Sequence, residues 1–289
     1  MLTTTTNFDA KHDADKKKPV YLIRFLDSDV VFGSKGADAA VPTLTLIVAS
    51  ADHAQSADNV ALTQANTLPA SGLYLCYDLA SASGSSVTDD GTGGNDATLV
   101  GSPTIVSGEG VVLNGSQYVD ANTTLQAQFR DDFTLSIPIK PDDGQPSYAQ
   151  SIFGAYTIPD RFRVFLATDG SLDIDFRVDN VDVAINIGQT LTGFSNGAQS
   201  EFTTIGVVVK RDESLSVFVN GELATTPTDI SAWSGYQELY TSAVEVSVGM
   251  ALGTGDYFEG RVGKKVRFYT AAATAAQMLA MHNADNPDA

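Results

Sequence analysis

The stretch TTIGVVVKRDESLSVFVNGELA, residues 203–224, decides the fold of this 289-residue chain. Leu215, Val217 and Val219 recur at every second position, which is the period of a β-strand with one buried face. Asn220-Gly221 follows at once, and this pair favours a type I′ turn because both central residues of that turn need positive φ. The stretch therefore predicts a β-hairpin that turns at residues 220–221.

A second hairpin is predicted in RFRVFLATDGSLDIDFRV, residues 161–178. Each half carries apolar residues at alternate positions, so the loop length decides which of them face each other. A two-residue loop would place Leu166 opposite Asp173, whereas a three-residue loop that ends at Gly170 places Leu166 opposite Leu172. We therefore expect a type I turn with Gly170 in the left-handed region, forming a G1 bulge.

Short alternating segments separated by Gly, Asn, Asp and Ser recur through most of the chain, and helical periodicity is nearly absent. This pattern is typical of a β-sandwich or a β-barrel. The exception is TAAQMLAMHN, residues 274–283, where Thr274 and Gln277 have the spacing of a capping box. Met278, Leu279 and Met281 would form its packing face. We expect one short C-terminal helix, laid against the edge of the sandwich.

The first 70 residues have a different pattern. KKKPVYLIRFL (16–26) and VVFGS (30–34) predict a small hairpin, and PTLTLIVAS (42–50) predicts a third strand. A small, polar stretch with Pro69 near its end reads as a linker. We expect a docking or assembly segment at 1–68 and a β-sandwich at 71–289. About 65 residues are marginal for an independent core, so the first segment should pack on a neighbour or on another copy.

The chain is strongly acidic, with 35 Asp and Glu against 17 Lys and Arg and a net charge of −18. This balance argues against nucleic acid as a partner, because phosphate binding needs a basic patch. The N-terminus lacks the apolar core of a signal peptide, and no apolar run approaches the ~20 residues that span a bilayer. We expect synthesis in a cytoplasm and no membrane insertion. Cys76 is the single cysteine and reads as a buried apolar thiol.

Several segments, taken in order, resemble laminin G-like domains of the concanavalin A-like lectin/glucanase fold. They are GLYLCYDLASASGSSVTDDGTGGNDATLVG (72–101), GVVLNGSQYVDA (110–121), FTLSIPIKPDD (133–143), FTTIGVVVKRDESLSVFVNGELA (202–224) and YFEGRVGKKVRFYTAAATAAQMLAMHN (257–283). Order and spacing agree from about 71 to 284, although Pro138 stands where the family usually has Trp.

The resemblance implies a mainly β fold, with two antiparallel sheets packed face to face as a jelly roll, a small β segment in front and a short C-terminal helix. Members of the family bind sugars, proteins or lipids, often with calcium, and many are structural or adhesive modules. The fold alone does not choose among these roles.

Glucanases of this fold carry two Glu flanking an Asp at alternate positions of one strand, where two nearby carboxyl groups act as acid and nucleophile. The nearest stretch here is SLDIDFRV (171–178), which has Asp173 and Asp175, then Arg177, and no Glu. We expect an exposed strand face opposite a buried Leu-Ile-Phe face. No catalytic residue and no glycosidase activity are therefore predicted.

A calcium site is a candidate in TDDGTGGND, residues 88–96. Ca²⁺ needs six to eight oxygen ligands, and this loop offers the side chains of Asp89, Asp90, Asn95 and Asp96. The family often adds an acidic residue from the closing strand, but Gly263 stands at that position. The alternative is an acidic turn that holds no metal.

Aromatic residues supply a candidate carbohydrate platform, because flat apolar sugar faces stack on aromatic rings. Trp233, Tyr236 and Tyr240 lie together in SAWSGYQELYT (231–241), and Tyr156 and Tyr257 lie in other expected loops. The alternative for Trp233 is a small satellite core under a long loop.

KKKPVYLIRFL also resembles the start of some bacteriophage tail and baseplate proteins. A docking segment before a lectin-like domain is a common plan of phage adhesins. We expect a non-catalytic virion protein, exposed on a tail or capsid surface, that contacts a host-surface glycan. It would bind other virion subunits through residues 1–68 and form homo-oligomers. The alternatives are a purely structural decoration or bridging protein, and a degenerate glycan-processing enzyme.

Overall fold

The computed structural model describes residues 8–12, 19–23, 67–69, 71–125, 127–156, 161–178, 181–231, 245–251 and 255–285. The chain divides into two compact units, Met1–Pro42 and Thr43–Ala289. In the first unit, β1 (Phe8–His12) pairs antiparallel with β2 (Pro19–Ile23). β2 lies inside the strand predicted at 16–26, but its partner is upstream. The other two predicted strands, 30–34 and 42–50, lie outside the described residues, and the boundary near residue 70 stays a prediction.

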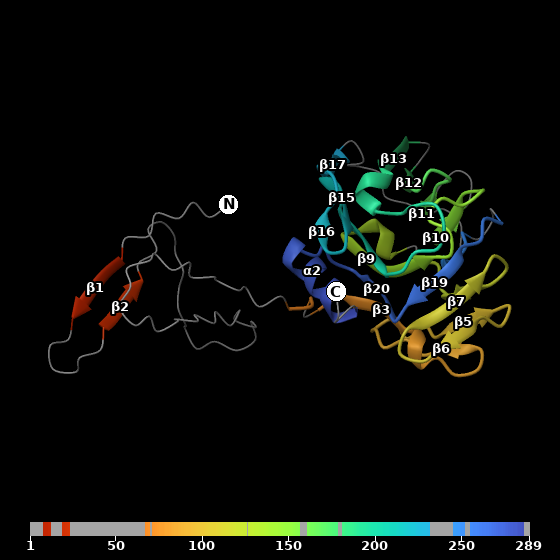
Figure 1. Ribbon diagram of the computed structural model, residues 1–289, viewed down its shortest axis with the longest axis horizontal. Helices are drawn as coiled ribbons and strands as arrows, with labels where there is room; N and C mark the ends of the chain where they lie inside the picture. Colours follow the sequence, from red (N-terminus) through yellow and green to blue (C-terminus); the bar gives the residue numbers. More distant parts are fainter. Residues whose placement is uncertain are drawn as a thin grey trace. The chain divides into compact units, whose positions relative to one another are not determined.

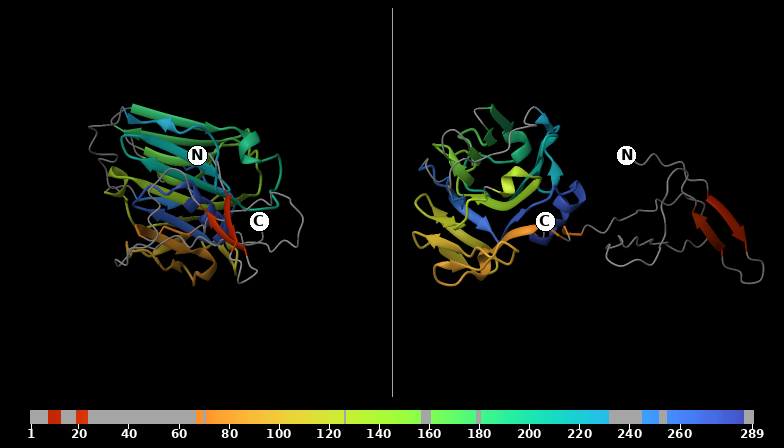
Figure 2. Two further views of the ribbon diagram at one scale, coloured as in Figure 1. Left: turned by 90° about the vertical axis from the view of Figure 1, so that its left-hand side faces the viewer. Right: turned by 180° about the vertical axis from the view of Figure 1, so that it is seen from behind.

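The described residues from 71 onward form two antiparallel sheets that face each other (Figures 1 and 2). Sheet A contains, in order, β13 (Val181–Ile187), β12 (Leu172–Val178), β11 (Arg161–Leu166), β10 (Gln150–Tyr156), β18 (Ser247–Val248), β8 (Tyr118–Asp120), β5 (Ala97–Val100) and β4 (Ser86–Val87).

Sheet B contains β16 (Glu222–Leu223), β15 (Ser214–Val219), β14 (Thr203–Lys210), β9 (Phe133–Pro141), β19 (Glu259–Gly263), β7 (Gly110–Asn114) and β6 (Thr104–Val106). β17 (Thr228–Asp229) lies beside β15, and β20 (Lys265–Tyr269) lies between β9 and β3 (Leu73–Asp78). Among the described residues of this unit there are four helical segments: η1 (Leu79–Ser81), η2 (Gln128–Arg130), α1 (Gln189–Thr192) and α2 (Ala275–Asp285). The predicted fold class is confirmed.

Both predicted hairpins are present with the expected turns. Asn220 and Gly221 have φ of 52° and 79°, and Val219 pairs with Glu222. Both positive values fit the type I′ turn that the Asn-Gly pair predicts.

The three-residue loop of the second hairpin is also confirmed. Leu166 lies opposite Leu172, and Gly170 has a φ of 81°. The Gly170 N–H donates to the Ala167 carbonyl at 3.1 Å, and the Ala167 N–H donates to the Ser171 carbonyl at 2.8 Å. This is the bonding of a type I turn closed by a G1 bulge.

The core lies between the sheets and follows from side-chain alternation. One buried row crosses sheet A through directly opposed residues, namely Ile185, Ile174, Val164, Phe153, Val248, Val119 and Leu99. From sheet B, Phe133 enters the same core with its ring centroid 5.1–5.5 Å from those of Phe129, Phe162 and Phe268. Such aromatic contacts stabilise a core beyond the area they bury.

The C-terminal helix begins at the predicted capping box. The Thr274 N–H donates to Gln277 Oε1 at 2.8 Å, and the Gln277 N–H donates to Thr274 Oγ1 at 3.3 Å. Met278 and Met281 are fully buried against a cluster that includes Val208. The helix therefore lies on the outer face of sheet B and not at the edge of the sandwich, where we expected it.

Glycine at position 206 makes room for this helix. A Cβ atom on Gly206 would lie 2.2 Å from Met278 Cε. Its neighbours Val207, Val208 and Val209 are all buried, so β14 is apolar on both faces. A strand of this kind must be covered on both sides, and α2 supplies the second cover.

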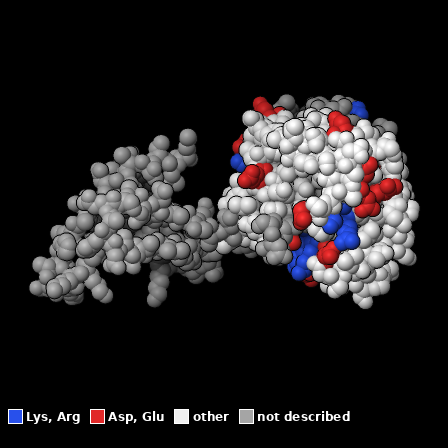
Figure 3. Space-filling view, viewed as in Figure 1, with Lys and Arg blue, Asp and Glu red and all other residues white. Residues whose placement is uncertain are grey.

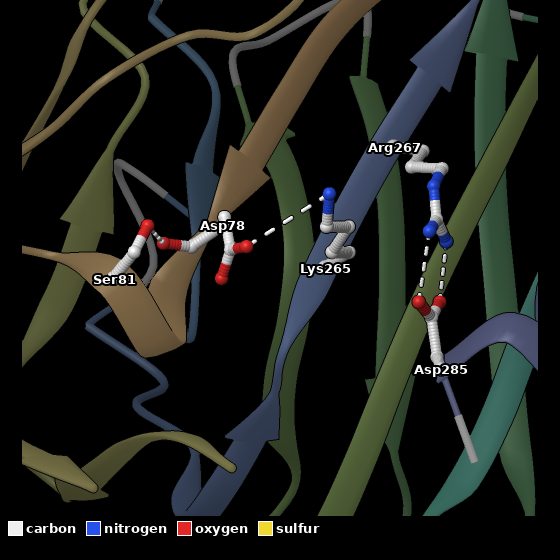
Figure 4. A network of polar contacts seen from close by, with 5 residues as sticks. All are labelled: Asp78, Ser81, Lys265, Arg267 and Asp285. Carbon is white, nitrogen blue, oxygen red and sulfur yellow. Dashed lines mark hydrogen bonds and ion pairs between the residues drawn. The ribbon is translucent and has the colours of Figure 1, made fainter. Parts of the chain in front are cut away.

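A buried ion pair fixes the last turn of α2 to the sheet (Figure 4). Arg267 Nη2 lies 2.8 Å from Asp285 Oδ1, and Arg267 Nη1 contacts the other carboxylate oxygen. The two side chains are only 5% and 1% exposed, so the fork is shielded from water. On the same strand, Lys265 Nζ lies 3.8 Å from Asp78 Oδ2 of β3.

Pro138 occupies a place in β9 where a missing N–H is harmless. It lies opposite Thr204 of β14, but the N–H and C=O of Thr204 bond to Asn220 instead. The nitrogen of Pro138 therefore points to the other side of β9. On that side, β9 pairs with β19 through residues 139–141 and with β20 through residues 134–136. Pro138 lies between these two paired stretches, where the neighbouring chain passes from β19 to β20. Proline is accepted where no ladder bond is lost.

Candidate functional site

A row of mostly polar residues, called here the polar row, crosses the outer face of sheet A, and Ser247 in its middle is fully buried. Its members are directly opposed residues of successive strands, namely Ala184, Asp175, Arg163, Gly154, Ser247, Asp120, Thr98 and Ser86. It lies one residue along the strands from the buried apolar row, so the same alternation gives sheet A an apolar inner face and a polar outer face. Since α2 packs on sheet B, this row is not under that helix.

Arg163 is the centre of the charged part of the row. Its guanidinium lies 4.0 Å from the centroid of the Phe165 ring, and its Nη1 lies 3.1 Å from Asp256 Oδ2. Asp256 belongs to the segment between β18 and β19. The Arg163 side chain is only 15% exposed, so the cation is held in one position by a ring and a carboxylate.

Asp173 is oriented by a neighbour on the edge strand. Asn186 Nδ2 donates to Asp173 Oδ1 at 2.7 Å and to Ser171 Oγ at 3.0 Å. Burial raises the pKa of Asp173, and the hydrogen bond from Asn186 opposes that rise. The pair presents fixed acceptor and amide groups on the outer face, as sites for hydroxyl-rich ligands require.

The expected division of SLDIDFRV into two faces is confirmed. Leu172, Ile174 and Phe176 are fully buried, whereas the side chains at 173, 175 and 177 are partly exposed. Arg163 of β11 lies directly opposite Asp175 of β12, so a basic residue and an acidic residue are neighbours across these two strands.

Two tyrosines form a pair on the same face. The ring centroids of Tyr118 and Tyr257 are 6.3 Å apart, with an interplanar angle of 48°. Burial first, and then the Asp120 carboxylate, raise the pKa of Tyr118. The pair offers rings for stacking next to the polar row.

Sequence reasoning identified Tyr257 but missed Tyr118. The sequence signal for Tyr118 is the alternation in YVDA (118–121), where the apolar residues Val119 and Ala121 predict that their neighbours face outward. In the structure Val119 and Ala121 are indeed buried. Tyr156 is the last residue of β10, opposite Arg161, so it lies in a strand and not in the loop that we expected. Trp233, Tyr236 and Tyr240 lie outside the described residues, and their part in a platform stays a prediction.

The acidic loop at 88–96 covers the open edge of β3. Asp89 Oδ1 accepts the N–H groups of Cys76 and Gly91, both at 2.8 Å, and Asp89 Oδ2 accepts that of Asn95 at 3.1 Å. Asp96 Oδ1 accepts the Asp89 N–H at 2.9 Å. Backbone bonds from residues 90, 92 and 93 also reach carbonyls of β3. Asp89 and Asp96 thus hold the loop in place as hydrogen-bond acceptors.

The residues proposed for calcium lie near one another in the loop. The side chains of two of them bond to backbone N–H groups, and these bonds do not direct the carboxylate oxygen atoms toward a common point. Asp90 is exposed, and Asn95 Nδ2 donates to the Gly93 carbonyl at 2.9 Å. Within the described ranges, no group of three or more His, Cys, Asp or Glu side chains is arranged to hold a metal ion. A Cβ at Gly263 would lie 2.8 Å from Pro138 Cβ, which explains why an acidic residue is missing there. Calcium binding stays a prediction.

The basic residues of the sandwich are few and mostly paired. Figure 3 shows acidic side chains scattered over the face in view and basic ones gathered where β19 and β20 lie. In that region Arg261 pairs with Glu109, Lys265 pairs with Asp78, and Lys140 Nζ donates to the Ser200 carbonyl at 3.1 Å. No described helix is long and apolar enough to cross a membrane.

Residues 113–278 match the family model of the concanavalin A-like lectin/glucanases superfamily, of the laminin G type. This match covers more than half of the chain, and the protein belongs to that superfamily. A search of curated proteins finds no significant match.

Solved structures share the fold at low sequence identity. The binding domain of paraclostridial mosquitocidal protein 1 has a TM-score of 0.54 and 12% identity, over 74% of this chain and 52% of that one. The receptor-binding domain of botulinum neurotoxin C/D mosaic serotype has a TM-score of 0.57 and 8% identity, and the match covers 74% of this chain and 51% of that one. A Trypanosoma rangeli sialidase has a TM-score of 0.55 and 13% identity, and the match covers 86% of this chain and 37% of that one. The chain thus spans about half or less of these proteins.

Proposed function

We propose that this protein is a non-catalytic carbohydrate-contact module, which binds a glycan of a host surface through the outer face of sheet A. The observation that carries the proposal is the polar row of sheet A with the Tyr118–Tyr257 pair beside it. This face combines rings, carboxylates, an amide and a guanidinium, and it is not under α2.

The chemistry of the face suits a sugar. The Tyr118 and Tyr257 rings would stack on the apolar face of a pyranose, and Asp120 and Asp173 would accept hydrogen bonds from its hydroxyls. Arg163 is already oriented by Phe165 and Asp256, so little side-chain freedom is lost when a ligand binds.

The structural relatives support a role in surface recognition. Two of them are described as a binding domain and a receptor-binding domain of toxins. The superfamily description itself contains lectins as well as glucanases. We propose no catalysis for this chain, because the outer strand face has Asp173, Asp175 and Arg177 where the glucanase pattern has carboxylates at all three positions.

We further propose that the protein is part of a bacteriophage virion, attached through residues 1–68 and exposed on the particle. The support is the resemblance of residues 16–26 to tail and baseplate proteins and the order of a docking segment before a lectin-like domain. A purely structural decoration protein is the second candidate. An image of the assembled particle separates the two, since a neighbouring subunit would cover the outer face of sheet A in a structural role.

The binding test compares tyrosine variants of the full chain. An immobilised oligosaccharide array identifies a binding sugar, and titration calorimetry with that oligosaccharide then measures affinity. Tyr118→Ala and Tyr257→Ala should each weaken binding about tenfold, because an aromatic contact contributes roughly 1 kcal/mol or more. Tyr148→Ala is the matched control, since Tyr148 is exposed and its hydroxyl bonds Glu259 of sheet B.

All three variants should unfold at the wild-type temperature within a few degrees. Absence of binding to every sugar on the array, or equal losses in all three variants, would refute the proposed face.

A further inference from the structure

The open edges of the two sheets are protected in most places. β4, β16 and β17 have two residues each, and β6 has three. β3 is longer, but residues 89–93 bond to its free edge. Short or covered edges are the usual protection against pairing with another chain.

β13 is the exception among the described strands. It has seven residues, forms the end of sheet A and, within the part of the chain that the structure describes, pairs on one side only, with β12. Its sequence VDVAINI carries one charged residue, Asp182, and no proline. Ala184 and Asn186 are exposed, and Leu191, which follows in α1, is 48% exposed. A long edge strand with little charge is a template for another strand.

We propose that β13 pairs antiparallel with β13 of a second copy of this chain, about a twofold axis at Ala184. Directly opposed residues of an antiparallel pair point to the same face of the sheet. When the two strands are identical copies related by a twofold axis, the axis must therefore lie between one residue and the same residue of the second copy. Ala184 is the midpoint of β13, and only this centre pairs all seven residues.

The pattern of the strand agrees with this register. Val183 lies opposite Ile185 of the second copy, so apolar residues of the core side meet. Asp182 lies opposite Asn186, whereas an axis at position 182 would oppose two like charges, which is unfavourable. Ala184, at the axis, has a small exposed side chain that two copies can bring together.

The pairing would join the polar rows of the two copies. The row on the outer face of sheet A ends at Ala184, and across the axis it would continue from Ala184 to Asp175 of the second copy. Two ligand faces on one continuous sheet would bind a repeating polymer with higher avidity than one. The inference rests on the strand edge and not on the proposed glycan binding, and its tests measure association alone.

A cysteine at the axis provides the first test. Opposed Cα atoms in an antiparallel pair are about 4.5–5.5 Å apart, within the range of a disulfide. The full chain with Ala184→Cys, oxidised with oxidised glutathione, should run as a covalent dimer on non-reducing electrophoresis. Wild type should not, because Cys76 is 3% exposed. Thr98→Cys and Thr104→Cys place exposed controls on β5 and β6 and should stay monomeric on the gel.

Sedimentation equilibrium provides the second test. Wild type should be dimeric, and Ala184→Lys should weaken the dimer at least tenfold because two ammonium groups meet at the axis. Ala184→Ser should retain it, and both variants should keep the wild-type melting temperature at concentrations where wild type is monomeric. A monomeric wild type overturns the inference. So does a dimer that neither cross-links at 184 nor responds to Ala184→Lys, since its contact then lies elsewhere, for example in residues 1–68.

Discussion

The outer faces of the two sheets differ in what they carry and in what covers them. In sheet B, Val208, Phe218 and Tyr269 face outward, are nearly fully buried, and pack under α2. In sheet A, the outward residues include Arg163, which contacts the Phe165 ring and pairs with Asp256, and Asp173, which accepts a hydrogen bond from an amide. Both sheets share one core, so the difference concerns only the second face of each sheet.

The comparison teaches how a second cover is encoded. A strand that is apolar at consecutive positions, such as IGVVV in β14, needs cover on both faces, whereas strict alternation, as in β12, leaves one face for water or a ligand. Sheet B therefore carries α2 on its outer face, whereas the outer face of sheet A is not under that helix. The predictions that follow test the two sides, from the largest expected effect to the smallest.

Breaking the cover of sheet B should cost most. Asp285→Ala leaves the Arg267 guanidinium buried without its carboxylate, and loss of one partner of a buried pair costs about 3–5 kcal/mol. Urea unfolding followed by fluorescence measures the free energy of unfolding. Lys265→Ala is the control, because its pair with Asp78 is longer and more exposed, at 29% and 19%, and should contribute no more than ~1 kcal/mol. Equal losses in the two variants would contradict a special role for the Arg267–Asp285 pair.

Damage to a turn of sheet A should cost less. Gly170→Val forces a β-branched residue to a φ of 81°, and its Cβ would lie 2.8 Å from the Phe194 carbonyl oxygen. A loss of about 1–3 kcal/mol in unfolding free energy is expected from such backbone strain. Gly188→Ala is the matched control in the same sheet region, since Gly188 has a φ of −57° and open space around it. A neutral Gly170→Val would show that the turn relaxes without strain.

Acidification should act with opposite sign on two groups, His282 of the C-terminal helix and Asp173 of sheet A, and each effect should be small. On the helix side, burial lowers the pKa of His282, whose Nδ1 lies 3.0 Å from Thr204 Oγ1, while Asp285 opposes that shift. The unfolded chain then binds the proton more readily than the folded chain. The stability that neutral His282 provides is present above about pH 6.5 and is lost as pH falls below it.

On the sheet A side, burial raises the pKa of Asp173 above its usual value of 3.8. Here the folded chain binds the proton more readily, so protonation of Asp173 adds stability as pH falls through the raised pKa. Melting temperatures measured from pH 7.5 to 4 check both signs. His282→Gln should reduce the loss between pH 7 and 5, and Asp173→Asn should remove the gain at lower pH. A steeper loss in His282→Gln would contradict the assignment.

The sequence was informative where neighbours along the chain decide the structure. Asn220-Gly221, the register around Gly170 and the capping box of Thr274 each depend on a few consecutive residues, and each is confirmed. The position of α2 could not be predicted, because it depends on Gly206 being opposite Met278 in space.

The candidate site followed the same rule. Alternation placed Asp173 and Asp175 on the outer face, but the contact of Arg163 with Asp256 joins residues 93 positions apart. The pairing of Tyr118 with Tyr257 likewise depends on a strand and a distant segment that meet only in the folded sheet. The hydrogen bond from β3 to Asp89 could not be predicted either. In a sequence, carboxylates of a glycine-rich loop look the same whether they accept backbone N–H groups or bind a cation.

The pairing of β3 with β20 has a consequence for how the molecule forms. The Gly72 carbonyl accepts a hydrogen bond from Thr270, 198 positions later, and the first and last strands of the sandwich are direct neighbours. During synthesis at roughly 5–20 residues per second, β3 leaves the ribosome about 10–40 seconds before its partner exists. Contacts so distant in sequence make folding slow. The nascent sandwich must therefore wait with one edge of β3 unpaired until β20 has been synthesised.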